Sequence, residues 1–380
     1  MNNRTLIIGS GLAGITLARE LRKQDKARAI TIVSADDGSF YSKPNLSNAF
    51  AAGKKPDEMV LTAAAKLESD LAIKILPFTP VAEIDTTTRE VTHPQGRLAY
   101  DQLVLAVGAS QIPLPLAGDG VADAISVNSL ADYARLRDKL AGKRHVAIIG
   151  AGLIGCEFAN DLRQGHFEVD VFDTAAQPLA RLLPASAAAA MHEKLSAIGI
   201  NFHLSTNLVA IQRNGTGYIL IDAEGTARKY DLVLSAIGLR PNLGLAKSAK
   251  LATRVGILTD RYLTTSNPHI YALGDCIEIE GQYLPYVMPI MQGAKKLAAT
   301  MTGTPEAVSY PAMPIVVKTP ACPTVISPPK IGDGHWEETL TPDGLRALYM
   351  DKASGQPTGF VLQGALTKER MVLASMMPGL

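Results

Sequence analysis

The sequence has little cysteine, and this scarcity limits the chemistry it can perform. Only three of the 380 residues are cysteines, Cys156, Cys276 and Cys322, and no two of them form a CxxC pair. An odd number of widely spaced cysteines argues against a disulfide framework. The seven histidines show no HxxxH or His-Cys spacing, so a structural metal site is not expected.

Charge of one sign and long apolar runs are missing as well. The net charge of +1 excludes a surface that binds nucleic acid or membrane as a whole. No apolar stretch approaches the roughly 20 residues that a membrane-spanning helix needs. The chain enters an apolar segment at residues 6–8 with no leader before it, so a cytoplasmic protein is expected. A hydrophobic content of 47% in 380 residues predicts two or three globular domains.

Two segments of the sequence resemble each other. Residues 5–14 read TLIIGSGLAG, and residues 146–155 read VAIIGAGLIG. Each joins an apolar strand to a GxGxxG turn and a helix with apolar residues at helical spacing, and a further strand follows at residues 30–33 and 169–172. One GxGxxG alone is weak, but two in this context predict an α/β fold with two Rossmann-like dinucleotide-binding domains.

The glycines of such a turn have separate tasks. The first permits a tight turn, the second lets the backbone approach a pyrophosphate, and the third lets helix and strand pack closely. The pyrophosphate then lies on exposed N–H groups at the positive end of the helix dipole. The candidate cofactor-binding residues are therefore Gly9, Ser10, Gly11, Leu12, Ala13 and Gly14 in the first turn, and Gly150, Gly152, Leu153, Ile154 and Gly155 in the second.

An acidic residue indicates which nucleotide the second unit binds. Asp173 comes eighteen residues after Gly155, just past the next strand. A carboxylate there suits the free 2′- and 3′-hydroxyls of an NAD ribose and would repel a 2′-phosphate. This favours NADH over NADPH, although a solvated turn acid would give the same pattern.

The first unit leaves two interpretations open. Its second strand ends at Ser34, and Asp36 and Asp37 follow. Either acid reaches a ribose, or Ser34 and the backbone of Ala35 line the adenosine site. Asp37 and Gly38 are also typical of a simple turn.

Three more apolar strands end in glycine. One leads to Gly274 and Asp275, where a carboxylate can accept hydrogen bonds from a ribityl hydroxyl and glycine permits close approach. The strands that end at Gly108 and Gly238 are expected to be crossings between the two nucleotide domains.

Together these residues resemble the glutathione-reductase-like superfamily of flavoproteins with two dinucleotide-binding domains. Residues 265–275 look like its second FAD motif, and residues 238–242 look like the turn after its NAD domain. The resemblance implies a discontinuous FAD-binding domain at residues 1–113 and 240–310. An NAD-binding domain at residues 114–239 is inserted into it, and a small α+β interface domain at residues 311–380 follows.

The segment after the first unit indicates the branch of the superfamily. Branches that reduce disulfides or peroxides need a redox cysteine against the flavin, whereas residues 41–47 read YSKPNLS and contain none. The pattern K-P-x-L-S resembles the branch that feeds rubredoxins and ferredoxins. Within it the sequence is most similar to the rubredoxin–NAD(+) reductase family of alkane-degrading bacteria, through residues 41–44, 152–161, 271–276, 286–289 and 317–323.

This resemblance implies a function and roles for single residues. NADH would reduce FAD, and FAD would pass single electrons to rubredoxin. Lys43 is expected near flavin N5 and O4, with Glu157 as its carboxylate partner, and these two are the catalytic candidates. By resemblance the backbone of Val81 binds the adenine side of FAD, Asp275 binds the ribityl or phosphate region, and Val287 and Lys318 close the isoalloxazine face.

Other functions compete with this one. A ferredoxin or flavorubredoxin reductase would use the same cofactors and differ in its acceptor. A non-catalytic, NADH-sensing flavoprotein belongs to another class. A docking face for an acidic rubredoxin needs local basic residues, and Lys295, Lys296 and residues 368–370 are candidates.

Overall fold

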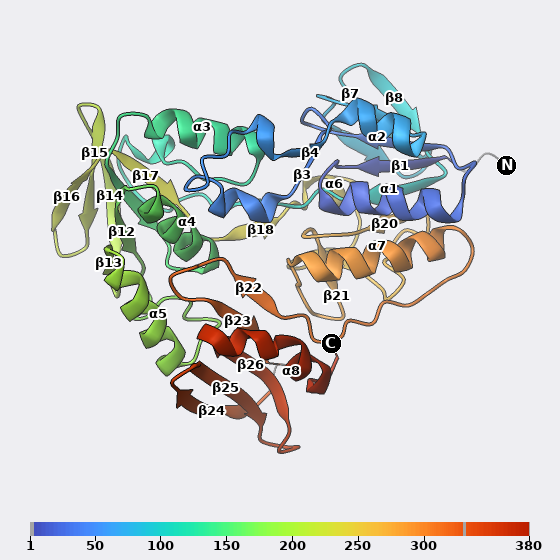
Figure 1. Cartoon of the computed structure of the whole chain (residues 1–380). Helices are drawn as coiled ribbons and strands as arrows, with labels where there is room; N and C mark the ends of the chain where they lie inside the picture. Colours follow the sequence, from blue (N-terminus) through green and yellow to red (C-terminus); the bar gives the residue numbers. More distant parts are fainter. Residues whose placement is uncertain (1–3, 330–331, 380) are drawn as a thin grey trace. The chain divides into compact units, whose positions relative to one another are not determined.

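The computed structural model describes residues 4–329 and 332–379, which form two compact units (Figure 1). The first unit contains the chain up to residue 42, residues 57–110 and residues 239–310. The second contains residues 43–56, residues 111–238 and the chain from residue 311. Among the described residues, no helix is both long enough and apolar enough to cross a membrane.

A five-stranded parallel sheet forms the centre of the first unit. Its strands lie in the order β20 (Ile270–Ala272), β9 (Gln102–Leu105), β1 (Thr5–Ile8), β2 (Ile30–Val33) and β5 (Lys74–Leu76). All four residues of β1 are buried, as expected for a central parallel strand with both faces covered. Helices α1 (Leu12–Gln24) and α7 (Val287–Met301) lie side by side against this sheet (Figure 1).

Smaller elements complete the first unit. They are an antiparallel sheet of β6 (Glu83–Asp85), β7 (Glu90–His93) and β8 (Gly96–Ala99), the strand pairs β3 (Phe40–Tyr41) with β4 (Val60–Thr62) and β19 (Ile257–Thr259) with β21 (Ile277–Ile279), and the helices η2 (Asp57–Met59), α2 (Ala64–Leu71) and α6 (Gly244–Ser248). The strands β10 (Ala109–Gln111) and β18 (Leu239–Pro241) lie where the chain passes from one unit to the other.

A second parallel sheet, of four strands, lies in the second unit. Its order is β13 (Ile200–His203), β12 (Glu168–Phe172), β11 (His145–Ile149) and β17 (Leu232–Ser235). One face packs against α4 (Leu153–Gln164) and α5 (Ala185–Ala197), and α3 (Leu130–Leu140) joins the same core. The other face packs against an antiparallel sheet of β14 (Leu208–Asn214), β15 (Gly217–Asp222) and β16 (Ala227–Tyr230).

The last part of the second unit is a five-stranded antiparallel sheet with short helices. Its strands are β22 (Ile315–Val317), β23 (Thr324–Ser327), β26 (Pro357–Gln363), β25 (Gly344–Asp351) and β24 (Gly334–Thr341), in that order. Helices η4 (Gly364–Glu369) and α8 (Arg370–Met376) follow, and η1 (Lys43–Asn48) and η3 (Val121–Asp123) also belong to this unit.

The predicted fold class is confirmed: each GxGxxG turn joins a parallel strand to a helix, and an α+β region ends the chain. Residues 43–56 pack with the second unit. There Tyr133 Oη and Arg137 Nη1 donate hydrogen bonds to the Lys54 carbonyl at 2.9 and 3.0 Å. The predicted division into three domains stays a prediction.

Candidate active site

The first glycine of each motif occupies backbone that other residues rarely adopt. Gly9 has φ +113° and Gly150 has φ +110°. A Cβ on Gly9 would lie 2.2 Å from the Ala106 oxygen, and a Cβ on Gly150 would lie 2.6 Å from the Ala236 oxygen. Both positions therefore require glycine, as the predicted tight turn demands.

The third glycine of each motif lets the helix pack onto its own loop. A Cβ on Gly14 would lie 1.9 Å from the Gly9 oxygen, and a Cβ on Gly155 would lie 1.9 Å from the Gly150 oxygen. No side chain fits at that distance. The same strand-to-helix geometry is thus present in both units.

The second glycine of each motif faces open space. Gly11 and Gly152 are the N-caps of α1 and α4, neither helix start has a side-chain cap, and a Cβ would meet nothing within 4 Å. The first N–H groups of each helix are therefore available to an anion at the positive end of the dipole. Each glycine turn, with the helix start that follows it, forms a cradle that fits the pyrophosphate of a dinucleotide. Around them lie the other predicted residues, namely the buried Ser10 and Ala13, the half-buried Leu12 and Leu153, and the exposed Ile154.

The predicted NAD acid lies beside the second cradle. Asp173 directly follows β12, and its Oδ2 accepts a hydrogen bond from Ala151 N, inside the glycine turn, at 2.6 Å. Its Oδ1 accepts another from Ala175 N at 2.8 Å. These bonds hold the carboxylate at the carboxyl end of the parallel sheet, where a ribose binds in this fold. The ribose-binding role of Asp173 stays a prediction.

In the first unit the predicted adenosine residues form one hydrogen-bonded cluster. Ser10 Oγ and Ser34 Oγ are 2.6 Å apart, and both hydroxyls bond to Asp36 Oδ1, Ser10 at 3.0 Å. Asp37 instead closes a turn by accepting a hydrogen bond from Ser39 N at 2.9 Å. Asp36 is therefore the acid that lies beside the first glycine turn.

A second loop is tied to the same cluster. Thr79 N donates a hydrogen bond to the backbone carbonyl oxygen of Ser34, and Phe78 N donates one to that of Asp36, each at 2.7 Å. Val81 follows two residues later, half-buried, and Ala35 is exposed between the two bonded residues of the first segment. Backbone from two segments thus surrounds the place where an adenosine is predicted.

The second FAD motif meets the first glycine turn within the first unit. Gly274 has φ +95°, and a Cβ there would lie 2.9 Å from the Ala13 Cβ. Asp275 follows it. The buried Tyr283 hydroxyl has no hydrogen-bond partner among the described residues, and burial, followed by the charge of Asp275, raises the pKa of Tyr283. A buried hydroxyl without a partner beside a carboxylate fits a polar group of bound FAD. Val287, the first residue of α7, is 40% exposed.

The predicted crossings are glycines in left-handed backbone. Gly108 has φ +64° and Gly238 has φ +111°. The Gly108 oxygen accepts a hydrogen bond from Asn242 N at 3.0 Å, and Asn242 Oδ1 accepts one from Ser110 Oγ at 2.7 Å. This pairing fixes the chain where it leaves and re-enters the first unit.

Glu157 is a buried acid of the second unit with several hydrogen-bond partners. It is the fifth residue of α4 and is fully buried. Its Oε2 accepts hydrogen bonds from Ser47 Oγ at 2.5 Å and Lys318 Nζ at 2.6 Å, and its Oε1 accepts one from Lys318 N at 3.0 Å. The structure therefore joins two predicted residues, Glu157 and Lys318, and reaches the Lys-Pro-x-Leu-Ser segment through Ser47. The pairing of Glu157 with Lys43 stays a prediction.

The sequence analysis assigned no role to two further polar residues of α4. Asp161 accepts hydrogen bonds from Phe50 N at 2.9 Å and Ala51 N at 3.0 Å, and Asn160 accepts one from Ala321 N at 3.3 Å. Burial raises the pKa of Asp161, and these backbone donors oppose that shift. One face of α4 carries the polar residues Glu157, Asn160 and Asp161 at helical spacing. This polar stripe on an otherwise apolar helix is the sequence pattern that could have identified Asn160 and Asp161.

The three cysteines are free and buried. Burial raises the pKa of Cys276 to about 12 and also raises the pKa values of Cys156 and Cys322. A thiol kept protonated is a poor nucleophile near neutral pH. This agrees with the absence of a redox cysteine motif in the sequence.

Comparison with known proteins places the chain in a family. The model for pyridine nucleotide-disulphide oxidoreductases matches residues 3–302, and the model for a rubredoxin binding C-terminal domain matches residues 307–377. The chain belongs to the pyridine nucleotide-disulphide oxidoreductase family.

Individual relatives match this oxidoreductase over nearly its whole length. Rubredoxin-NAD(+) reductase of Alcanivorax borkumensis is 43% identical over 377 residues, 99% of this chain and 98% of the relative. The enzyme of the same name from Acinetobacter baylyi is 46% identical over 385 residues, with the same coverage. A ferredoxin reductase structure from Rhodopseudomonas palustris superimposes with a TM-score of 0.88 at 27% identity, covering 98% of this chain and 95% of that one.

Proposed function

We propose that this oxidoreductase uses NADH to reduce a bound FAD and passes the electrons to rubredoxin. The two cradles would serve any branch of the family. The observation that carries the choice of acceptor is the match of residues 307–377 to a rubredoxin-binding domain. It is supported by the two rubredoxin-NAD(+) reductases that align with nearly the full length of this chain.

The residues of the chain would bind and orient both cofactors. Bound FAD takes two electrons as a hydride and releases them singly, which a one-electron acceptor requires. The α1 cradle with Ser34 and Asp36 would hold FAD, and the α4 cradle with Asp173 would hold NADH.

Two lysines are proposed to face the flavin ring, Lys43 at its N5 and O4 edge and Lys318 at its N1–C2 edge. The placement of both rests on the family resemblance. Glu157 holds both the backbone N–H and the ammonium of Lys318, so this cation has a fixed position. A fixed cation stabilises negative charge on a reduced ring without reorganising.

The setting of the reaction is also a proposal. From the sequence we propose that the enzyme works in the cytoplasm, and by resemblance that it supplies electrons for alkane hydroxylation. Among the predicted docking cations, Lys296 already pairs with Glu306 at 2.5 Å, whereas Lys368 and Arg370 are exposed. Next to them, Met371, Val372 and Met376 of α8 are also exposed, at 68%, 66% and 62%. An apolar patch beside cations suits a small acidic partner.

The test is NADH-driven reduction of purified rubredoxin by the yellow protein, with ferredoxin and flavorubredoxin as competing acceptors and NADPH as the control donor. The proposal expects rapid turnover with rubredoxin and NADH. Faster turnover with ferredoxin or flavorubredoxin would assign a different acceptor. Slow flavin reduction with no effective acceptor would favour the NADH-sensing alternative.

A further inference from the structure

Residues 43–56, called the strap below, pack with a different unit from the chain on either side of them. The residues before and after the strap belong to the first unit, whereas the strap belongs to the second. It begins with the short helix η1, whose first residue is Lys43. Lys43 is one of the two lysines that the proposed function places at the flavin ring. The contacts that fix the strap therefore decide where Lys43 lies.

Two carboxylates of α4 hold the strap, four residues apart along the helix. Glu157 Oε2 accepts a hydrogen bond from Ser47 Oγ, inside η1, at 2.5 Å. Just past the end of η1, Phe50 N donates to Asp161 Oδ2 at 2.9 Å and Ala51 N donates to Asp161 Oδ1 at 3.0 Å. Residues four apart lie on the same face of a helix. The two acids thus bind successive parts of the strap from one face of α4.

Asp161 uses both of its oxygens to hold the backbone of the strap. It is only 3% exposed, and burying a carboxylate is costly unless its oxygens are hydrogen-bonded. Burial raises the pKa of Asp161, while the two N–H donors and the charge of Arg137 oppose that shift. We expect a buried charge of this kind to fix one conformation of the strap more than to stabilise the fold.

The side chain of Phe50 is held in the second unit as well. Its ring meets the ring of Phe167 edge-on, with the centroids 5.3 Å apart, and the guanidinium carbon of Arg137 lies 5.0 Å from its centroid. A Cβ on Gly165 would lie 2.9 Å from Phe50 Cδ1. Glycine at this position therefore leaves the room that the ring needs, and Phe50 is held through both its backbone and its side chain.

We propose that Asp161 is a positioning residue for Lys43. It fixes the end of η1, and a short helix that is fixed at its end holds its first residue in one place. A cation in a fixed place stabilises negative charge on the reduced ring without reorganising. The proposal rests on the proposed function, because it takes Lys43 to face the flavin, and it deepens that function by giving a role to Asp161.

Hydrogen exchange in the full-length, FAD-loaded protein tests the anchor itself. In Asp161→Asn one acceptor oxygen replaces two, and an NH2 group faces a strap N–H. The strap peptide that contains Phe50 and Ala51 should then exchange these two amides roughly tenfold faster than in the wild type. Exchange in the antiparallel sheet of β14, β15 and β16 should not change. Unaltered exchange at the two amides would overturn the proposal.

The midpoint potential of the bound flavin tests the link to Lys43. Lys43→Met should weaken the stabilisation of the reduced flavin roughly tenfold, which lowers the two-electron potential by about 30 mV. Asp161→Asn should lower the potential in the same direction, and Asp161→Leu, which removes both acceptors, should lower it further. Because Asp161 acts through Lys43, neither change should lower the potential again in a Lys43→Met background.

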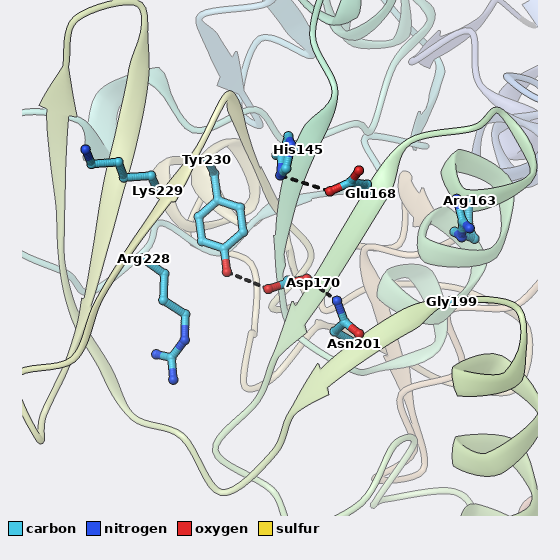
Figure 2. A pocket seen from close by; sticks show the side chains of 9 residues that line it. All are labelled: His145, Arg163, Glu168, Asp170, Gly199, Asn201, Arg228, Lys229 and Tyr230. Carbon is cyan, nitrogen blue, oxygen red and sulfur yellow. Dashed lines mark hydrogen bonds and ion pairs between the residues drawn. The ribbon is translucent and has the colours of Figure 1, made fainter.

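The matched control is Asp170→Asn. Asp170 is also a hydrogen-bonded acid of the second unit, and it lines a polar pocket of about 600 Å³ at the amino-terminal edge of the second parallel sheet. Figure 2 shows its bonds to Tyr230 and Asn201, and His203 is its third partner. These partners lie in β13 and β16 and not in the strap. Asp170→Asn should therefore leave the flavin potential unchanged.

The outcomes separate this inference from the placement of Lys43 on which it rests. A wild-type potential in Lys43→Met would remove Lys43 from the flavin and overturn both, while NADH-driven reduction of rubredoxin still tests the overall function. If Lys43→Met lowers the potential and the two Asp161 variants do not, the inference alone is overturned. An equal drop from the Asp161 changes with and without Lys43 would overturn it as well.

Discussion

At the scale of single residues, the buried Glu157 has more hydrogen-bond partners than the single partner, Lys43, that the sequence analysis assigned to it. Leaving a buried charge without a partner is strongly destabilising, and here Ser47 and Lys318 supply three donors. The sequence identified both Glu157 and Lys318 as candidates. It did not show their contact, because 161 positions separate them and only the folded chain brings them together.

We predict that Glu157→Gln lowers the free energy of unfolding by about 1–3 kcal/mol, since glutamine cannot neutralise the Lys318 ammonium. Lys318→Met should cost a similar amount. The free energy of unfolding is measured in urea for both single variants and for the double variant Glu157→Gln/Lys318→Met. The double variant should lose less of this free energy than the sum of the two single losses. Strictly additive effects would show that the ion pair contributes nothing.

Asp173 carries the coenzyme preference in this account. Because its carboxylate would repel a 2′-phosphate, Asp173→Asn should raise the ratio of kcat/KM for NADPH to kcat/KM for NADH roughly tenfold or more, equivalent to about 1.4 kcal/mol. The matched control is Asp170→Asn on the same strand, which should leave the ratio unchanged. A ratio that is the same in wild type and Asp173→Asn would remove Asp173 from the ribose site.

At the scale of elements, hydrophobic periodicity and glycine spacing predicted both strand–turn–helix units. The strand expected at residues 30–33 is β2, and the strand expected at residues 169–172 lies within β12 (Glu168–Phe172). Local pattern suffices there because each element is defined by residues close together in the chain. It could not place residues 43–56, whose position depends on side chains of α3 and α4 such as Tyr133 and Asp161.

Alanine substitution of the second glycine should have a different effect in each of the two cradles. Gly11→Ala and Gly152→Ala fit the backbone and meet no atom within 4 Å, so both variants should fold. Gly11→Ala should lose FAD, measured as absorbance at about 450 nm per chain, whereas Gly152→Ala should keep FAD and raise the KM for NADH at least about tenfold.

Gly14→Ala serves as the structural comparison. Its Cβ would lie 1.9 Å from the Gly9 oxygen, so it should yield little folded protein. If Gly11→Ala kept its full flavin content, or if Gly152→Ala lost its FAD, the assignment of the cradles would be wrong.

At the scale of the whole molecule, the sequence predicted the class of enzyme but not the pocket at the amino-terminal edge of the second sheet. The walls of that pocket come from β12, β13 and β16, which carry no shared motif. The docking surface is similar. Composition showed a balanced charge, and only the structure shows that cations and exposed apolar residues meet at the start of α8.

We predict that Lys368→Glu/Arg370→Glu raises the KM for rubredoxin several-fold at low salt and flattens its salt dependence, because steering by these cations is lost. The control is Lys66→Glu, an exposed lysine of α2 in the first unit. NADH-driven reduction of a small-molecule acceptor should be unchanged in all of these proteins. An unaltered salt profile with rubredoxin would exclude this face as the docking site.

The central claim is that electrons pass through FAD without any help from sulfur. It is tested most directly by anaerobic titration of the oxidised, purified protein with NADH while the flavin absorbance is followed. The account predicts complete bleaching at one NADH per FAD, since the flavin is the only two-electron group. A requirement for two NADH per FAD would reveal a second redox pair among the cysteines and would contradict the account, as would a purified protein that binds no flavin.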